Sequence, residues 1–309
     1  MCNSVLKDKC VQLLEGETVA FPSCAKVNLF LYIIGRRADG YHLIKSLFVP
    51  VSLFDILKVR LISKSGLIVR CDEDWFDSSN NTLKQAFDHF SKFSGFKIGM
   101  SIWLIKNIPV GSGLGGGSSN AATLLKLLNI LMKLRDGNAL KLDELLYIGA
   151  KIGADVPFFI KGRPAMIEGI GDIIKEIRLK DDLYFVIAYP SIPFYTRNMY
   201  NLYDKLNRLT KHTKGDKHLP PFLGYKYIAR TVYNDFEAVL RGRRSKIIMN
   251  LKNSLKKYGA GAAALSGSGS AVFGIFRDVS DSSFAYLRMI EDFPDYKIFS
   301  AKVVRGDPL

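Results

Sequence analysis

The sequence predicts an α+β protein, and three observations carry this prediction. The first third of the chain is rich in strand-like runs in which apolar and polar residues alternate. Amphipathic segments with helical spacing of their apolar residues come after these strands. A run with five glycines between Gly111 and Gly117 separates a strand-like segment from a helical one, and glycine at this density indicates a loop with a specific backbone role.

The composition is that of an ordinary globular protein. Its 309 residues suit two closely packed domains, and 48% hydrophobic residues allow a sizeable core. The net charge of +15 suits an anionic partner, namely a nucleotide, a nucleic acid or a membrane surface. A general lysine bias explains the same charge without any partner.

Cysteine usage and the hydrophobic segments indicate a cytoplasmic protein. Cys2, Cys10, Cys24 and Cys71 form no C-x-x-C pair and lie near no histidine cluster, which argues against a zinc site and a disulfide scaffold. The N-terminal segment has no long apolar core, so it is not typical of a signal peptide. No later segment has the apolar length that spans a bilayer.

The first region is predicted to be an antiparallel sheet. A strand-like run covers residues 19–34, and the Asp39-Gly40 pair that follows is a strong hairpin signal. A second strand is expected over about 41–51, and further strands over 54–61 and 66–70.

Helices and strands are mixed in the rest of the chain. Asn80-Asn81-Thr82 offers an N-cap for a helix, and a strand over 97–105 follows it. Further helices are expected over 120–134, 143–152 and 196–206, and further strands over 158–160, 165–167, 184–188, 263–276 and 296–304. Two more helices are expected in the last third, and residues 207–227 are predicted to be a loop. A domain boundary near residue 165 divides the chain.

The glycine run is best explained as an anion-binding loop. Its glycines let backbone N–H groups approach an anion, and the positive end of the following helix points to the same place. A Walker A loop is excluded, because Ser118 stands where that motif requires lysine. A G-x-G-x-x-G fingerprint is met by Gly111, Gly113 and Gly116, but the spaced acidic residue Asp136 follows a helix and not a strand. We therefore favour a nucleotide phosphate as the anion over a dinucleotide or a merely flexible loop.

Several blocks of sequence, taken together, resemble the GHMP kinase superfamily. They are Ala25-Lys26-Val27-Asn28-Leu29-Phe30-Leu31, Arg37-Ala38-Asp39-Gly40-Tyr41-His42, residues 108–122, Gly153-Ala154-Asp155-Val156-Pro157-Phe158 and Leu265-Ser266-Gly267-Ser268-Gly269-Ser270. The glycine block is common to the superfamily. The A-K-x-N-L and D-G-Y-H blocks resemble one family within it, which phosphorylates 4-diphosphocytidyl-2-C-methyl-D-erythritol. That family commonly has proline where Cys24 stands here.

The resemblance implies a fold and an activity. The fold has an ATP-binding N-terminal domain like ribosomal protein S5 domain 2 over 1–165 and a ferredoxin-like C-terminal domain over 166–309. The activity is ATP-dependent phosphorylation of the 2-hydroxyl of 4-diphosphocytidyl-2-C-methyl-D-erythritol, in the non-mevalonate route to isoprenoid precursors. ATP and Mg²⁺ are the implied cofactors. The implied protein is a cytoplasmic monomer or weak homodimer, with no nucleic-acid or membrane partner.

Lys26 and Asp155 are the predicted catalytic residues. Taken singly, a mid-strand lysine is usually exposed at a sheet edge, and an aspartate before Val156-Pro157 is usually a helix cap. As a pair they have a chemical purpose. Asp155 would take the proton of the acceptor hydroxyl, and Lys26 would hold Asp155 ionised and favour the alkoxide.

The remaining site residues are assigned by the resemblance. For ATP they are Asn81, as an adenine contact or only as an N-cap, and Pro109, Val110, Gly111, Ser112, Gly113, Leu114, Gly115, Gly116, Gly117, Ser118 and Ser119. For the acceptor substrate they are Asn28, Tyr41, His42, Thr196, Tyr200, Gly267 and Ser268. Tyr41 would stack on cytosine and His42 would bond to the edge of that base. Ser118 or Ser119 is the expected metal ligand.

Two other functions remain open from the sequence. Another GHMP kinase is one, although the D-G-Y-H block argues against it. A basic nucleic-acid-binding protein is the other, and it would explain the net charge and the cluster of Arg241, Arg243, Arg244 and Lys246. It would leave the combination of the glycine loop, Lys26 and Asp155 without a purpose.

Overall fold

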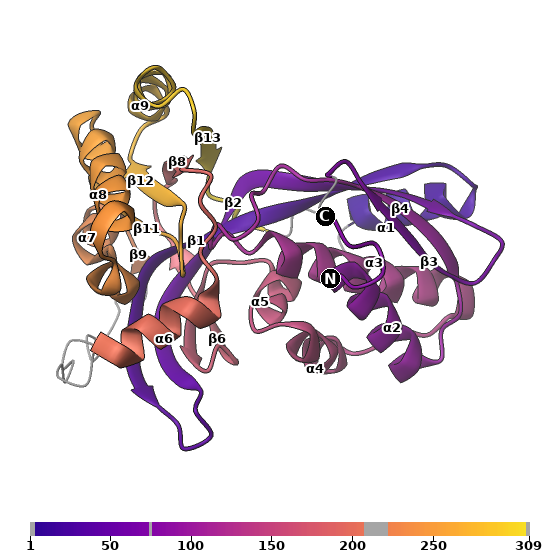
Figure 1. The fold of residues 1–309 in the computed structure, drawn as a ribbon. Helices are drawn as coiled ribbons and strands as arrows, with labels where there is room; N and C mark the ends of the chain where they lie inside the picture. Colours follow the sequence, from indigo (N-terminus) through magenta and orange to yellow (C-terminus); the bar gives the residue numbers. More distant parts are fainter. Residues whose placement is uncertain (1–3, 74–75, 207–221, 307–309) are drawn as a thin grey trace.

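Two large sheets, a third sheet of two short strands and their helices form the architecture of the computed structural model, which describes residues 4–73, 76–206 and 222–306. This confirms the predicted α+β class. The molecule is elongated, with α1 to α5 gathered at one end and α7 to α9 at the other, while the long strands β1 and β2 run between them (Figure 1). No helix in the described part of the chain combines the length and apolarity required to cross a bilayer.

The larger sheet contains the predicted antiparallel hairpin. Its strand order is β10-β1-β2-β4-β3, with β5 beside β2 and β6 beside β5. The strands are β1 Val19–Arg36, β2 His42–Leu61, β3 Gly66–Cys71, β4 Gly99–Ile105, β5 Ala165–Gly169, β6 Ile173–Glu176 and β10 Tyr233–Asn234. β1 and β2 pair from Val19↔Val59 to Arg36↔His42, so the strands predicted over 41–51 and 54–61 are one continuous strand. An irregularity in this pairing falls between Cys24 and Ala25, one residue before Lys26.

Five helices accompany this sheet. They are α1 Ser4–Leu14, α2 Thr82–Ser94, α3 Gly116–Asp136, α4 Leu142–Ile152 and α5 Val156–Lys161. Asn81 caps α2, because its side chain accepts the N–H of Lys84. α3 starts within the glycine run, four residues before its predicted start, and it is buried along much of its length. Helix α1 was not predicted from the sequence.

The strand predicted over 158–160 is wrong, because these residues lie in α5. The helix holds Pro157 in its first turn, where the missing N–H of proline costs no hydrogen bond. Val156, Phe158, Phe159 and Ile160 are all buried. A short run that is apolar on every side shows no periodicity, so its pattern does not separate strand from helix.

The smaller sheet is wholly antiparallel and has the order β11-β12-β8-β13. Its strands are β8 Tyr184–Tyr189, β11 Ala262–Leu265, β12 Val272–Phe276 and β13 Lys297–Lys302, and α8 Gly242–Lys257 and α9 Val279–Asp292 pack on it. The strand predicted over 263–276 is therefore two strands joined by a glycine turn. That turn approaches the glycine loop of the larger sheet.

Shorter elements connect the two parts. They are β7 Arg178–Leu179, α6 Thr196–Leu206, β9 Phe222–Leu223, α7 Tyr225–Thr231 and the 3-10 helix η2 Asp235–Val239. Most of the loop predicted over 207–227 lies outside the described residues. From 222 to 227 that prediction is wrong, since β9 and the start of α7 occupy these positions.

Candidate active site

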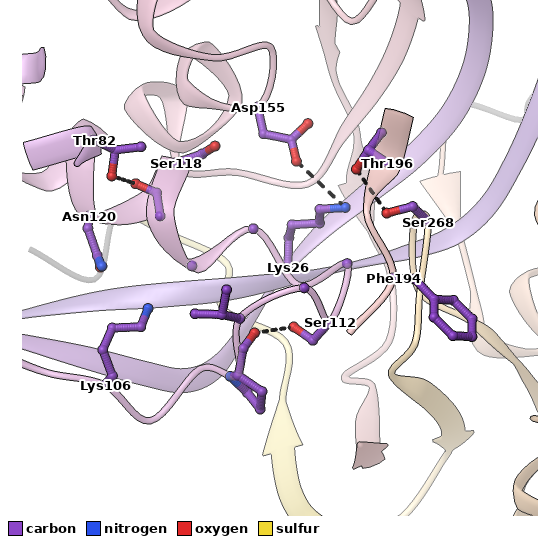
Figure 2. A pocket seen from close by; sticks show the side chains of 18 of the residues that line it. Lys26, Thr82, Lys106, Ser112, Ser118, Asn120, Asp155, Phe194, Thr196 and Ser268 are labelled. Carbon is purple, nitrogen blue, oxygen red and sulfur yellow. Dashed lines mark hydrogen bonds and ion pairs between the residues drawn. The ribbon is translucent and has the colours of Figure 1, made fainter. Parts of the chain in front are cut away.

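A cavity of about 620 Å³ collects most of the residues singled out from the sequence. Its walls come from β1, the glycine loop, the starts of α2, α5 and α6, and the turn between β11 and β12 (Figure 2). The predicted residues in its lining are Lys26, Asn28, Asn81, 109–113, 115–118, Asp155, Thr196, Tyr200, Gly267 and Ser268. Leu114, Ser119, Tyr41 and His42 are not among the lining residues.

Glycine is required in the loop by backbone conformation and by close contacts. Gly111, Gly113 and Gly115 have φ values of 64°, 78° and 76°, a left-handed region that other residues rarely adopt. A Cβ atom on Gly113 would lie 2.0 Å from the carbonyl oxygen of Ser266, and one on Gly116 would lie 2.9 Å from Cγ2 of Ile108. The density of glycines therefore has a steric cause at each of these positions.

The carbonyl groups of the loop are held from outside it. Four successive carbonyls, from Gly111 to Leu114, accept hydrogen bonds from other segments. The donors are the N–H groups of Phe194, Ser270, Ala271 and Lys26 and the hydroxyl of Ser266. The first N–H groups of α3 have no acceptor within their own helix. The loop therefore presents N–H groups and a positive helix end, the arrangement that binds a phosphate.

Asp55 organises the stem of this loop, and sequence reasoning missed it. Its carboxylate is fully buried and accepts the N–H groups of Asn107 and Ile108 at 2.9 and 2.8 Å. The same carboxylate forms an ion pair with Lys106 and accepts the side-chain N–H of Asn120 at 3.1 Å. These partners lie far away in sequence, so no local pattern marks Asp55.

Lys106 and Asn120 face the same cavity from the loop side. The Nζ atom of Lys106 lies 3.0 Å from the position that a Cβ on Gly116 would take, which places a cation beside the start of α3. The Oδ1 atom of Asn120 is buried and has no hydrogen-bond partner among the described residues. This end of the cavity thus offers a cation and a free acceptor in addition to the backbone.

Lys26 and Asp155 face each other across the cavity (Figure 2). Nζ of Lys26 lies 3.7 Å from Oδ2 of Asp155, and their side chains are 4% and 31% exposed. Asp155 stands at the N-cap of α5, but its side chain makes no capping bond. The carboxylate is therefore free to act in the cavity, and the structure separates it from the ordinary capping role.

Burial dominates the electrostatics of this pair. Loss of solvent lowers the pKa of Lys26, and the neighbouring Asp155 carboxylate opposes part of that shift. Nζ also lies 4.6 Å from the ring centroid of Phe48, a favourable position for a cation. The ammonium is thus poorly solvated and depends on Asp155, on Phe48 and on whatever anion occupies the cavity.

Asn28 lies beside Lys26, as the two-residue spacing on β1 predicts. Its Oδ1 accepts a hydrogen bond from the ammonium of Lys26, and its Nδ2 donates one to Oγ of Ser46 at 3.0 Å. A Cβ on Gly267 would lie 3.1 Å from both Oδ1 of Asn28 and Nζ of Lys26. The second glycine turn therefore closes over Lys26 and Asn28 from the smaller sheet.

The start of α6 forms a further wall of the cavity. Thr196 and Ser268 are joined through their hydroxyl groups at 3.0 Å. Tyr200 packs edge-on against Phe236, with ring centroids 5.0 Å apart. Burial raises the pKa of the Tyr200 phenol, and the nearby Asp155 carboxylate adds to the shift, so Tyr200 stays protonated. Phe194 and Phe236 also line the cavity and were missed, since an aromatic residue alone carries no signal in sequence.

Tyr41 and His42 lie at the far end of this wall. Tyr41 is 62% exposed at the hairpin end. The ring of His42 stacks on Tyr200, with centroids 4.3 Å apart and planes 15° apart. His42 therefore adjoins the cavity through Tyr200, while Tyr41 is exposed to solvent.

The polar side chains near the start of α3 have different surroundings. The Oγ of Ser119 is buried and accepts a bond from Ser23 at 2.8 Å, whereas Ser118 lines the cavity. The amide of Asn81 is used by α2 and by the backbone of Asp77 and Ser78. No group of three or more His, Cys, Asp or Glu side chains arranged for a metal occurs in the described part of the chain.

Two family models of one class of kinases match this chain. The family model for the GHMP kinases N terminal domain matches residues 81–163, and that for the GHMP kinases C terminal domain matches 226–295. The chain is a GHMP kinase, and the predicted two-domain GHMP fold is confirmed.

The relatives narrow the class to one family. A 4-diphosphocytidyl-2-C-methyl-D-erythritol kinase from Clostridium botulinum is 35% identical over 88% of this chain and 95% of its own length. The protein of the same name from Syntrophus aciditrophicus is 40% identical over 83% of this chain and 89% of its own length. A crystal structure of 4-(cytidine 5'-diphospho)-2C-methyl-D-erythritol kinase superposes with a TM-score of 0.75 at 28% identity, over 93% of this chain and 100% of the other. The chain belongs to the family of 4-diphosphocytidyl-2-C-methyl-D-erythritol kinases.

Proposed function

We propose that this chain transfers the γ-phosphoryl group of ATP to the 2-hydroxyl of 4-diphosphocytidyl-2-C-methyl-D-erythritol, a step in the non-mevalonate route to isoprenoid precursors. The observation that carries the proposal is the position of Asp155 and Lys26 in one cavity with the glycine loop. A phosphate-binding backbone and a carboxylate base thereby face the same space. This is the arrangement that phosphoryl transfer to an alcohol requires.

Each residue has a defined task in this reaction. The glycine loop and the start of α3 hold the triphosphate by N–H groups and by the helix dipole. The carboxylate of Asp155 accepts the proton of the 2-hydroxyl as the oxygen attacks the γ-phosphorus. The ammonium of Lys26 stabilises Asp155 as a carboxylate and the charge that develops on the attacking oxygen. Asn28, held by Lys26 and Ser46, is rigid enough to orient the acceptor hydroxyls.

Mg²⁺ belongs to the proposal as the ion that accompanies ATP. Ser118 and Asp155 both line the cavity and offer the oxygen donors that Mg²⁺ prefers, so the residues fit such an ion. Of the two serines considered, Ser118 is favoured, because the hydroxyl of Ser119 is buried against Ser23. The ion would neutralise the charge of the phosphates when it is bound.

Substrate and partner assignments are proposed with this activity. Thr196, Tyr200, Gly267 and Ser268 would enclose the acceptor, and Tyr41 and His42 its cytosine. We propose a cytoplasmic monomer or weak homodimer without a nucleic-acid or membrane partner. We also propose that domains 1–165 and 166–309 form the two walls of the cavity, although β5 and β6 beyond residue 165 extend the first sheet.

A coupled ADP-release assay tests the proposal directly. The purified chain should turn over with ATP, Mg²⁺ and 4-diphosphocytidyl-2-C-methyl-D-erythritol, and phosphorus NMR should show the new phosphate as a monoester on the 2-hydroxyl. Homoserine, mevalonate and galactose serve as alternative acceptors. Turnover with one of them and none with the cytidylyl substrate would overturn the proposed substrate while leaving the chain a GHMP kinase. Tight RNA binding with a steep salt dependence would favour the nucleic-acid function instead.

A further inference from the structure

Asp204 on α6 contacts both ends of the β1–β2 hairpin connection. Its Oδ1 lies 2.6 Å from Nε2 of His42, and its Oδ2 lies 3.3 Å from a guanidinium nitrogen of Arg36. Tyr200, one turn earlier on α6, covers one face of the His42 ring. Tyr203 meets the same ring edge-on and donates its hydroxyl to the carbonyl of Ile33 at 3.5 Å. One face of α6 therefore contacts the hairpin at the end of the cavity where Tyr200 lies.

We propose that Asp204 is a positioning residue that holds His42 in the tautomer with hydrogen on Nε2, and so leaves Nδ1 as an acceptor for the pyrimidine of the acceptor substrate. The inference rests on the proposed function only for the identity of that ligand. The juxtaposition of Asp204, Arg36, His42 and Tyr200 carries the rest.

The tautomer follows from what each group can donate. A carboxylate has no hydrogen and can only accept, so a bond of 2.6 Å requires hydrogen on Nε2. Neutral imidazole carries one hydrogen, and its other nitrogen is then an acceptor. No hydrogen bond to Nδ1 occurs within the described residues. The side chain of His42 is only 10% exposed and is held by stacking, so the direction of its Nδ1 lone pair is restricted.

An acceptor at Nδ1 discriminates between pyrimidines. Cytosine carries an amino group at position 4 and can donate, whereas uracil carries a carbonyl there and would set two lone pairs against each other. A buried polar pair of the wrong type costs considerably more than a missing bond. Asp204 would therefore favour a cytidine nucleotide over a uridine nucleotide without touching either.

The tautomer can be measured without any substrate. Long-range ¹H–¹⁵N spectra of the histidine-labelled protein at about pH 8, above the ordinary histidine pKa, distinguish the two neutral forms. A His42→Gln variant assigns the signal among the histidines. We expect one tautomer, with hydrogen on Nε2, in the native protein and a mixture in Asp204→Ala. A signal with hydrogen on Nδ1, or on both nitrogens, in the native protein would overturn the inference even if the proposed activity holds.

Kinetics test the consequence for recognition. In Asp204→Ala we expect KM for the cytidylyl substrate to rise on the order of tenfold, with kcat and KM for ATP within about twofold of native values. KM for the uridylyl analogue should rise less than KM for the cytidylyl substrate, so the preference of the enzyme for cytosine over uracil should shrink. Asp204→Asn keeps the shape and one acceptor oxygen, and it should fall between native and alanine.

Asp182→Asn is the matched control. Asp182 is 64% exposed and pairs with Arg305 at 2.9 Å. The control should leave both KM values unchanged. If KM rises equally for the cytidylyl and uridylyl substrates in Asp204→Ala, or if kcat falls together with Tm, then Asp204 only supports the fold. Absence of turnover with the cytidylyl substrate in the native protein would count against the proposed function and leave the tautomer measurement standing.

Discussion

The two ends of the cavity differ in the groups that they present, because one presents backbone N–H groups and the other presents side chains. At the end that we propose binds phosphate, the phosphate end, a contiguous glycine loop presents backbone N–H groups, and its conformation excludes side chains at Gly111, Gly113 and Gly115. At the end that we propose binds the acceptor substrate, the acceptor end, side chains from β1, the N-cap of α5, α6 and the β11–β12 turn converge on one place. A backbone site is specified by one short segment, whereas a side-chain site requires the whole fold.

The difference shows in how each end tolerates change. At the phosphate end, a substitution acts by adding atoms where there is no room for them. At the acceptor end, a substitution acts by removing one charge or one hydrogen bond from a set held together by tertiary structure. The phosphate end should therefore fail through ATP binding and the acceptor end through the chemical step or the acceptor substrate.

The largest effect is expected for Asp155→Asn. The variant lacks the carboxylate that we propose as the base for the acceptor hydroxyl, so kcat should fall about a thousandfold, while ATP binding measured by calorimetry stays within a few-fold of native. Asp88→Asn is the control, since Asp88 lies on α2 and forms only an exposed ion pair with Lys84. Loss of ATP binding in the first variant, or native turnover in it, would contradict the division between the two ends.

An intermediate effect is expected for Gly116→Val. Its Cβ would lie 2.9 Å from Ile108 and 3.0 Å from Nζ of Lys106, so the loop must move and KM for ATP should rise about tenfold to a hundredfold. Gly117→Ala is the matched control at the next position, where the nearest atom to a Cβ is Oγ1 of Thr82 at 3.5 Å. Equal ATP binding in the two variants would show that the loop adapts more easily than its contacts indicate.

The smallest effect is expected from the titration of Lys26. Because burial lowers its folded-state pKa, Lys26 should lose its proton below the ordinary value of 10.5, and kcat should fall as pH rises through that lowered pKa. Between the lowered pKa and 10.5 the unfolded chain binds more protons, so the native protein should gain stability with rising pH relative to Lys26→Met. The pH dependence of kcat checks the first expectation, and urea unfolding across the same pH range checks the second. If the free energy of unfolding of the native protein minus that of Lys26→Met falls as pH rises, the lowered pKa of Lys26 is contradicted.

Local sequence was sufficient wherever a contiguous pattern carries the physics. The Asp39-Gly40 hairpin, the helix capped by Asn81 and the glycine loop before α3 all follow from neighbouring residues, whereas the binding of an anion by that loop stays a prediction. The family resemblance added Lys26 and Asp155, which no pattern could join across more than a hundred residues. The strand predicted over 158–160 failed because a wholly apolar run carries no periodicity.

The sequence by itself was enough to predict an anion-binding glycine loop, since left-handed backbone and an exposed helix start are local properties. Only the tertiary structure decided what surrounds that loop. Asp55 gathers Lys106 and Asn120 at its stem, and Asp204 brings α6 onto His42 and Arg36. The physical reason is that hydrogen bonds and ion pairs between distant segments depend on burial and on distances of a few ångströms, and the order of residues along a chain contains neither directly.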